Sequence, residues 1–234
     1  KEDRLIYEES DPTFNAGVYL SKSREYIIIS SNSTMSDEYR TIPADRPSDA
    51  PRVFQPRERG HEHGIDHCNG TFYIRTNWDA QNFRLMRCEE SQTARQAWVE
   101  VIAARPDVMV ESFELFRDFL VVNERKNGMI LFRIIPMAGG EEHYLEFWEE
   151  AYWASFRHNH EQDASFLRFE YTSLTTPTSV YDYDLRTRQL SLRKQEEVLG
   201  GFDAADYHAE RHLAPSHDGT QVPISLVYRK DRFR

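Results

Sequence analysis

The sequence has little cysteine and no long hydrophobic run. Cys68 and Cys88 are its only two cysteines, which is too few for the disulfide framework of a small secreted domain. The most apolar runs, residues 27–29 and 129–132, are far shorter than the roughly 20 residues of a membrane span. The chain opens with KEDRLIYEES, which does not have the pattern of a signal peptide. We therefore expect a reducing, cytoplasmic location and no contact with a membrane.

Positive charge is also scarce. The chain has 29 Lys and Arg against 39 Asp and Glu, and its formal net charge is -10. A surface of this sign has no broad means of neutralising phosphates, so we expect no nucleic-acid partner. Basic partners fit the charge better, although net acidity also serves solubility.

Motifs that identify common catalytic and cofactor sites are missing. The sequence contains no G-x-S-x-G, H-E-x-x-H or C-x-x-C motif and no glycine-rich phosphate loop. We therefore predict no catalytic residue, no metal ligand and no cofactor on this chain, and the sequence does not identify substrate-binding residues.

The remaining histidines and acidic pairs give no spacing that predicts a site. His158 and His160 stand in a polar loop, where we expect them to be solvated. Three more histidines fall near the carboxyl end among glycines and a proline, at His208, His212 and His217. Acidic pairs occur at expected turns, where we interpret them as solubilising: Glu89-Glu90, Glu141-Glu142, Glu149-Glu150 and Glu196-Glu197.

The chain is rich instead in short alternating strands that repeat. With 39% hydrophobic and 13% aromatic residues it can fold around a core. Four segments near residues 14–56, 61–102, 109–147 and 151–195 share one plan of four strands. Their second strands begin 46, 47 and 48 residues apart, with YIIISS at Tyr26, FYIRTN at Phe72, FLVVNE at Phe119 and LRFEYT at Leu167. Four-stranded units of about 40 to 50 residues are typical of β-propeller blades.

The fold class that follows is all-β, with about four blades over residues 1–205. Only residues 98–112 and 149–156 also suit a helix by periodicity, and both contain residues that suit strands equally well. Beyond Gly200-Gly201 the period stops, and residues 206–234 predict two strands with Asp218-Gly219 in the turn between them.

The histidine-rich stretch HEHGIDHCNGTFYIRTN, residues 61–77, poses a choice between a metal site and the start of a strand. Asn69-Gly70 is a strong hairpin signal, so we predict an innermost strand before it. In that strand His61, His63 and His67 share one face, and Cys68 points to the other. His61 and His67 stand too far apart to share an ion, whereas His61 with His63 remains an alternative. We favour polar residues that line the propeller axis.

Several phrases resemble the oligopeptidase B (protease II) branch of the prolyl oligopeptidase family of serine peptidases. They are residues 61–77, NFRL, YTSLTTPTSVYDYDL, LRKQEEVLGGFDAADYHAER and DGTQVPISLVYRK. The resemblance implies a seven-bladed propeller that caps an α/β-hydrolase domain, restricts it to short peptides, and leads to cleavage after Arg or Lys. It also implies that residues 206–234 are the connector and first hairpin of the hydrolase domain, and that the catalytic triad lies downstream.

A stand-alone propeller that binds other proteins is the alternative function. In either case four blades of seven leave two end faces uncovered, so we expect either self-association, with two copies in an eight-bladed ring as one form, or an open arc stabilised by neighbouring molecules in a crystal. Residues expected on these end faces are Tyr19, Ile27 and Ile29 at one end and Phe169, Tyr181 and Tyr183 at the other. A closed four-bladed ring is disfavoured because large residues would crowd its axis, namely His61, Glu111, Phe113 and Trp153.

Overall fold

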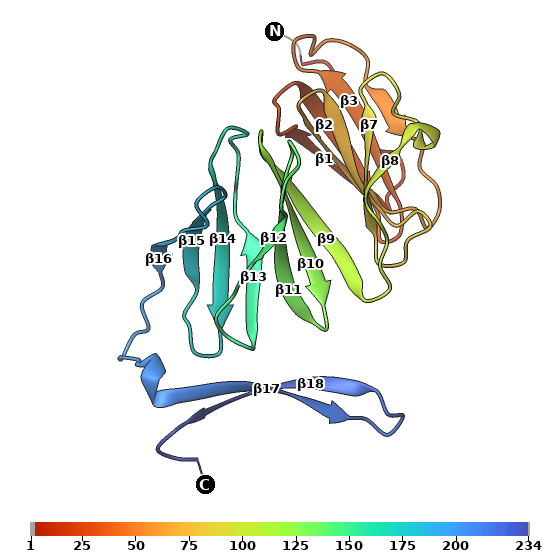
Figure 1. The fold of residues 1–234 in the computed structure, drawn as a ribbon. Helices are drawn as coiled ribbons and strands as arrows, with labels where there is room; N and C mark the ends of the chain where they lie inside the picture. Colours follow the sequence, from red (N-terminus) through yellow and green to blue (C-terminus); the bar gives the residue numbers. More distant parts are fainter. Residues whose placement is uncertain (1–2, 234) are drawn as a thin grey trace.

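The computed structural model describes residues 3–233, and its regular secondary structure is almost entirely β-strand (Figure 1). Four antiparallel four-stranded sheets follow one another along the chain, and a two-stranded hairpin comes after them. In each four-stranded sheet the strands pair in chain order. The prediction of an all-β fold with four blades is confirmed. Within residues 3–233, no helix is long and apolar enough to cross a bilayer.

The strands of the four sheets have the following bounds. The first sheet contains β1 (Asn15–Leu20), β2 (Tyr26–Asn32), β3 (Asp37–Pro43) and β4 (Arg52–Gln55). The second contains β5 (His63–Cys68), β6 (Thr71–Thr76), β7 (Arg84–Glu89) and β8 (Val99–Ile102). The third contains β9 (Val108–Leu115), β10 (Phe119–Lys126), β11 (Met129–Pro136) and β12 (His143–Leu145). The fourth contains β13 (Tyr152–Phe156), β14 (Phe166–Ser173), β15 (Ser179–Asp184) and β16 (Leu190–Gln195).

The stretches whose periodicity also suited a helix are strands. Residues 98–112 form β8 and the first part of β9, and residues 149–156 lead into β13. Over the described part of the chain, helical structure is limited to two 3-10 turns, η1 (Arg95–Ala97) and η2 (Ala204–Asp206).

Tight turns fix the register of the hairpins. Asn69 and Gly70, between β5 and β6, both have positive φ angles, of 51° and 71°. Asn127 and Gly128 connect β10 and β11 in the same conformation, with φ of 51° and 78°. Positive φ at both central residues defines a type I′ turn, whose twist matches that of the paired strands. The predicted hairpin turn at Asn69-Gly70 is therefore confirmed.

The core consists of three buried clusters, one between each pair of consecutive sheets. Ile28 and Phe54 of the first sheet pack on Phe72 and Trp98 of the second. The second and third sheets meet around the residues Cys68, Leu85, Ile102, Val110, Leu115 and Leu120. The third and fourth sheets meet around Phe132, Ile134, Leu167, Phe169, Tyr171 and Tyr183. Among residues 3–233 no such cluster joins the fourth sheet to the first, so the sheets form an open arc (Figure 1).

The prediction of which residues lie on the free face of the fourth sheet was wrong. Phe169 and Tyr183 lie inside the cluster between the third and fourth sheets, and Tyr181 packs against it. Side chains alternate between the two faces of a strand, so Arg168 and Glu170 occupy the free face instead.

The prediction for the free face of the first sheet was correct in part. Ile27 and Ile29 lie on the face of the first sheet that points away from the second, in a groove with Val18. Tyr19 was wrongly placed there, because its hydroxyl donates a hydrogen bond to the carbonyl of Ile65 in the second sheet at 2.8 Å.

The carboxyl-terminal hairpin lies across one end of the third and fourth sheets (Figure 1). It consists of β17 (Tyr207–Pro215) and β18 (Gln221–Arg229), and the loop between them contains Asp218-Gly219 as predicted. The Arg211 side chain donates to the carbonyl of Asn127, in the turn between β10 and β11. One guanidinium group thus attaches the hairpin to the third sheet.

Candidate functional site

The first strands of all four sheets meet around one cavity of about 610 Å³. Its wall includes Leu20 of β1, Asp66 of β5, Glu114 of β9 and Trp153 of β13. The loops that follow β1 and β13 complete it. The first strand of each sheet is therefore the innermost one, as predicted. This cavity is the inner wall of the arc and lies where a propeller has its central channel.

Two carboxylates, those of Asp66 and Glu114, form one side of the cavity. Burial raises the pKa of Asp66 and that of Glu114. Lys22 stands between them: its Nζ lies 3.0 Å from Glu114 Oε2, and its backbone N–H donates to Asp66 Oδ1 at 2.8 Å. The Lys22 ammonium also donates to the carbonyl of Asn159 in the fourth sheet's loop. A single cation therefore connects the first, third and fourth sheets across the cavity.

The other side of the cavity is formed by the loop after β13. Arg157 pairs with Glu170 at 2.8 Å. His158 and His160 stack with their ring centroids 5.2 Å apart and remain exposed, as predicted, although they stand on the rim of the cavity. The cavity wall therefore holds three carboxylates and three cations, the latter being Lys22, Arg24 and Arg157.

The histidine pair of the opening strand does not line the axis, so this part of the prediction was wrong. His61 and His63 are buried between the first and second sheets, with ring centroids 4.6 Å apart and nearly parallel planes. Trp98 and Tyr39 pack around them. Burial lowers the pKa of both rings, that of His63 to about 3, so both are neutral near pH 7. This face of β5 points at the neighbouring sheet rather than at the cavity.

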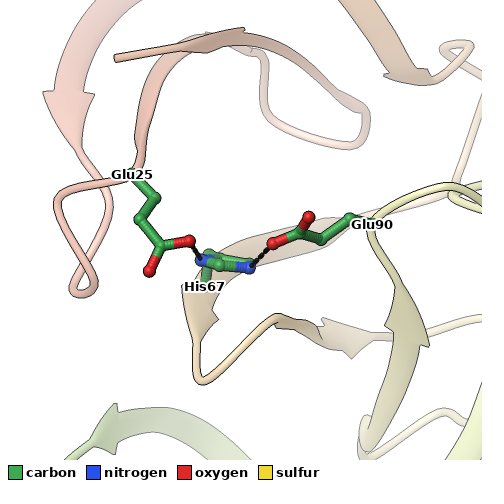
Figure 2. Close-up of side chains that lie close together, drawn as sticks. All are labelled: Glu25, His67 and Glu90. Carbon is green, nitrogen blue, oxygen red and sulfur yellow. Dashed lines mark ion pairs between the residues drawn. The ribbon is translucent and has the colours of Figure 1, made fainter. Parts of the chain in front are cut away.

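His67 lies on the same face but in a different environment. Its side chain is fully buried between Glu25, which precedes β2, and Glu90, which follows β7 (Figure 2). Nε2 lies 2.8 Å from Glu90 Oε1, and Nδ1 lies 2.7 Å from Ser23 Oγ. Burial lowers the pKa of His67, against the opposing effect of the two carboxylates. The sequence did not reveal this group, because the two glutamates come from hairpins distant along the chain.

Ser23, His67 and Glu90 have the connectivity of a catalytic triad but not its setting. In a serine peptidase the nucleophile stands exposed at a sharp turn beside an oxyanion hole. Ser23 accepts a hydrogen bond from its neighbour Glu25 and does not line the cavity. We therefore assign the group no catalytic role.

Cys68 points to the opposite face of β5, as predicted. It is buried between the second and third sheets, and burial raises the pKa of its thiol to about 11. Cys88 is also unpaired and buried.

Glu149 is not a solubilising turn residue, which corrects the interpretation of its acidic pair. Its carboxylate accepts hydrogen bonds from Tyr171 at 2.7 Å, Ser173 at 2.7 Å and Thr176 at 2.8 Å, and from Thr175. Burial opposes ionisation, but these hydroxyls hold the pKa of Glu149 below its usual value. The carboxylate thereby fixes the S-L-T-T-P turn between β14 and β15.

The three carboxyl-terminal histidines form no site. His208, His212 and His217 are exposed on the hairpin, and His212 Nε2 lies 3.1 Å from Glu210 of its own strand.

Comparison with known proteins identifies one domain type over most of the chain. Residues 1–196 match the model of the prolyl oligopeptidase amino-terminal β-propeller domain. Dipeptidyl aminopeptidase BI of Pseudoxanthomonas mexicana is 41% identical over 235 residues, which cover 100% of this chain and 32% of that protein. Protease 2 of Moraxella lacunata is 27% identical, over 97% of this chain and 32% of that protein.

Solved structures give the same result. Oligopeptidase B from Leishmania major superposes with a TM-score of 0.88 at 28% identity, over 98% of this chain and 34% of that chain. Oligopeptidase B from Trypanosoma brucei gives a TM-score of 0.86, also at 28% identity, over 96% of this chain and 33% of that chain. The chain thus spans about a third of the length of the proteins that it matches.

Proposed function

Because this chain belongs to the prolyl oligopeptidase family, as part of its amino-terminal β-propeller domain, we propose that it is the propeller portion of a serine-type oligopeptidase that cleaves short peptides after Arg or Lys. The similarity to Protease 2 and to two oligopeptidase B structures supports an oligopeptidase, and cleavage after Arg or Lys is proposed from the resemblance of the sequence phrases. Family membership also favours a peptidase over a stand-alone binding scaffold. The two unpaired cysteines support the cytoplasmic location that we expect for the enzyme.

The observation that carries the proposal is the match of residues 1–196 to the family's propeller domain, whose four first strands enclose a charged cavity. Asp66, Glu114 and Glu170 stand on the cavity wall beside three cationic side chains, and the chain as a whole carries a net charge of -10. The net negative charge of the chain attracts cationic peptides at long range, and the wall carboxylates can exchange their present cationic partners for those of a bound peptide. In the proposed enzyme the propeller restricts access to the active site and favours short basic peptides over neutral or acidic ones.

The hydrolytic groups belong, in this proposal, to a hydrolase domain outside the 234-residue sequence. The hairpin β17–β18 is proposed as the first element of that domain. Its Leu213, Ile224 and Leu226 side chains are exposed here and are suited to pack against further structure.

The test compares the purified chain with the protein at its full natural length. We expect chromogenic peptides that end in Arg or Lys to be hydrolysed by the full-length protein and not by the chain alone, because nucleophile, base and oxyanion hole are required together. Inhibitor-sensitive hydrolysis by the repurified chain would contradict the assignment of the catalytic groups. A full-length protein that cleaves only after uncharged residues would contradict the proposed specificity.

A second arm tests the role of the cavity. Raised salt should lower kcat/KM for a dibasic peptide, because it screens charges over a Debye length of about 8 to 10 Å. The Glu114→Gln variant should have a smaller salt dependence, whereas Glu142→Gln, an exposed carboxylate outside the cavity, should leave it unchanged. An identical salt dependence in all three proteins would exclude steering by the cavity.

A further inference from the structure

One loop of the fourth sheet reaches across the cavity to the other three sheets. It connects β13 to β14 over residues 157–165 and lies at the end of the arc opposite the carboxyl-terminal hairpin (Figure 1). Residues 157–160 line the cavity. The carbonyl of Asn159 accepts a hydrogen bond from the Lys22 ammonium, which belongs to the turn after β1. The loop thereby contacts the first sheet, with which the fourth sheet shares no buried cluster among residues 3–233.

Two further contacts join the loop to the second and third sheets. The Gln162 side chain donates a hydrogen bond to Asn69 Oδ1, in the turn between β5 and β6, at 2.9 Å. The Gln162 carbonyl accepts one from the backbone N–H of Arg117, in the turn between β9 and β10, at 2.8 Å. The Arg117 side chain also pairs with Asp163. The turns that follow the innermost strands of the other three sheets therefore all hold this one loop.

The contact with Lys22 is the most enclosed of these. The Lys22 side chain is 5% exposed, its Nζ lies 3.0 Å from Glu114 Oε2, and the same atom stands 4.6 Å from the centre of the Phe116 ring. Partly buried ion pairs are screened by salt much less than pairs on an open surface, such as that of Arg117 with Asp163. We therefore expect Lys22 to contribute most to holding the loop.

The loop itself stays on its own sheet through Asn159. Its Oδ1 accepts a hydrogen bond from the backbone N–H of Arg168 in β14 at 2.8 Å, and its Nδ2 donates one to the Arg168 carbonyl at 3.0 Å. Release of Lys22 would thus separate the loop from the first sheet and not from the fourth.

The loop has no apolar anchor in the core. None of residues 157–163 belongs to a buried cluster. Most of these residues are exposed, namely Arg157, His158, His160, Glu161 and Asp163. Segments with few buried apolar contacts are those that open locally at low cost in free energy. The contacts of the loop can therefore be released without emptying the core.

We propose that this loop is a lid at the end of the cavity away from the hairpin, held shut by Lys22, and that it sets the upper length of the peptides that the enzyme admits. The inference rests on the proposed oligopeptidase function and adds the residues that determine its size selection. With the lid shut, a peptide in the cavity extends only toward the hairpin. With the lid open, it also passes beyond the loop. Lys22 and Gln162 are positioning residues, because they act on the peptide through the lid.

The test measures the distance between the lid and the first sheet in the protein at its full natural length. Spin labels at Glu25→Cys and Glu161→Cys, both exposed positions, report this distance, and the two native cysteines are buried. Lys22→Met/Glu114→Gln removes both charges of the ion pair, so that no buried carboxylate is left unpaired. We expect a longer and broader distance distribution in this variant.

Two further variants sharpen the distance measurement. Arg84→Met/Glu100→Gln is the matched control, because it makes the same kind of change in a pair 3.4 Å apart on the outer strands of the second sheet, and it should leave the distance unchanged. Gln162→Ala removes the contact with Asn69 but keeps the Lys22 ion pair, so it should lengthen the distance less than the double variant does.

Kinetics test the size selection. The quantity compared is kcat/KM for a short peptide and for an unstructured chain several times longer, each with one Arg site. Their ratio should shift toward the longer substrate by at least about threefold in Lys22→Met/Glu114→Gln, because loss of the ion pair raises the share of molecules with an open lid. The ratio should stay constant in the matched control.

An unchanged distance in both lid variants, or a lengthened distance with an unchanged kinetic ratio, would overturn the proposal. If the unmodified protein cleaved neither substrate, the proposed function would fail instead. The distance measurement would then still decide whether Lys22 holds the lid.

Discussion

The two ends of the arc present faces of opposite chemistry. The free face of the first sheet is an apolar groove, in which the amino-terminal segment meets the sheet around Leu5, Ile6, Val18, Ile27 and Ile29. The free face of the fourth sheet carries ion pairs, between Arg168 and Asp182 at 2.7 Å and between Arg157 and Glu170 at 2.8 Å. Both sheets have the same four-stranded plan, so the difference lies in the side chains alone.

This contrast shows that the two ends have different requirements for a neighbour. Apolar surface in water costs about 25 cal/mol per Å², so the first sheet gains free energy when another surface covers it. On the fourth sheet each of these charges already has a partner of opposite sign, so further burial gains little, because desolvation offsets the attraction between the paired charges. The two free faces are therefore not complementary, which argues against the eight-bladed ring of two copies joined end to end.

The largest expected effect is the difference in stability loss between substitutions on the two faces of β14. Phe169→Ala empties a fully buried position between the third and fourth sheets and should lower the free energy of unfolding by about 3 to 5 kcal/mol. Arg168→Ala, next to it on the free face, should cost less than about 1 kcal/mol. Urea unfolding of the chain measures both, and equal losses would contradict the assignment of the faces.

The second effect depends on pH and concerns the contact between the first two sheets. The folded-state pKa of His63, about 3, is below the unfolded value of about 6.5, so the unfolded state takes up the proton first. The neutral His63 ring makes its full contribution to the free energy of unfolding above pH 6.5. As the pH falls from 6.5 toward 3, that free energy decreases by a few kcal/mol.

The His63→Phe variant should remove this loss, because phenylalanine does not titrate. The quantity to compare is the difference in unfolding free energy between variant and unmodified chain at each pH, since Asp37 and Asp66 have raised pKa values and act in the opposite direction. His217→Gln, on the exposed hairpin, is the control. A difference that stays constant between pH 7 and pH 4 would show that His63 is not buried as a neutral ring.

The third effect is on association. The isolated chain should self-associate through the first sheet's apolar face, in a symmetric contact, and light scattering over a concentration series should detect it. Val18→Lys, at a position with 70% exposure on that face, should reduce association. Val99→Lys, on the outer strand of the second sheet, should not. A monodisperse monomer at high concentration would contradict this prediction.

The smallest effect is on the ion pairs of the fourth sheet. A double-mutant cycle with Arg168→Gln and Asp182→Asn should give a coupling energy below about 1 kcal/mol, because the arginine is partly exposed and salt screens the pair. A coupling of several kcal/mol would show that this face is desolvated and would weaken the contrast between the two ends.

The blade plan was readable from the sequence because strand period and turn residues are local signals. The spacing of Tyr26, Phe72 and Phe119 and the Asn69-Gly70 turn were sufficient to locate the sheets. Which face of a strand packs inward is set by the neighbouring sheet, so the wrong face was chosen at Phe169.

The candidate sites were harder to predict for a related reason. The cavity takes one or a few residues from each of four strands, and the His67 group joins glutamates from two distant hairpins. Only the pairing of the sheets brings these residues together. Histidine spacing along one strand therefore pointed to His61 and His63, which the fold buries as neutral rings between two sheets.

The most direct test of the account measures whether the apolar end of the arc is covered in the full-length protein. Val18→Cys would be alkylated in the isolated chain and in the protein at its full natural length. Cys68 and Cys88 give little background, because both are buried and burial raises their pKa values, to about 11 and about 12. At protein concentrations low enough to keep the chain monomeric, we predict rapid labelling in the chain and at least about tenfold protection in the full-length protein. Equal labelling rates in both would contradict it.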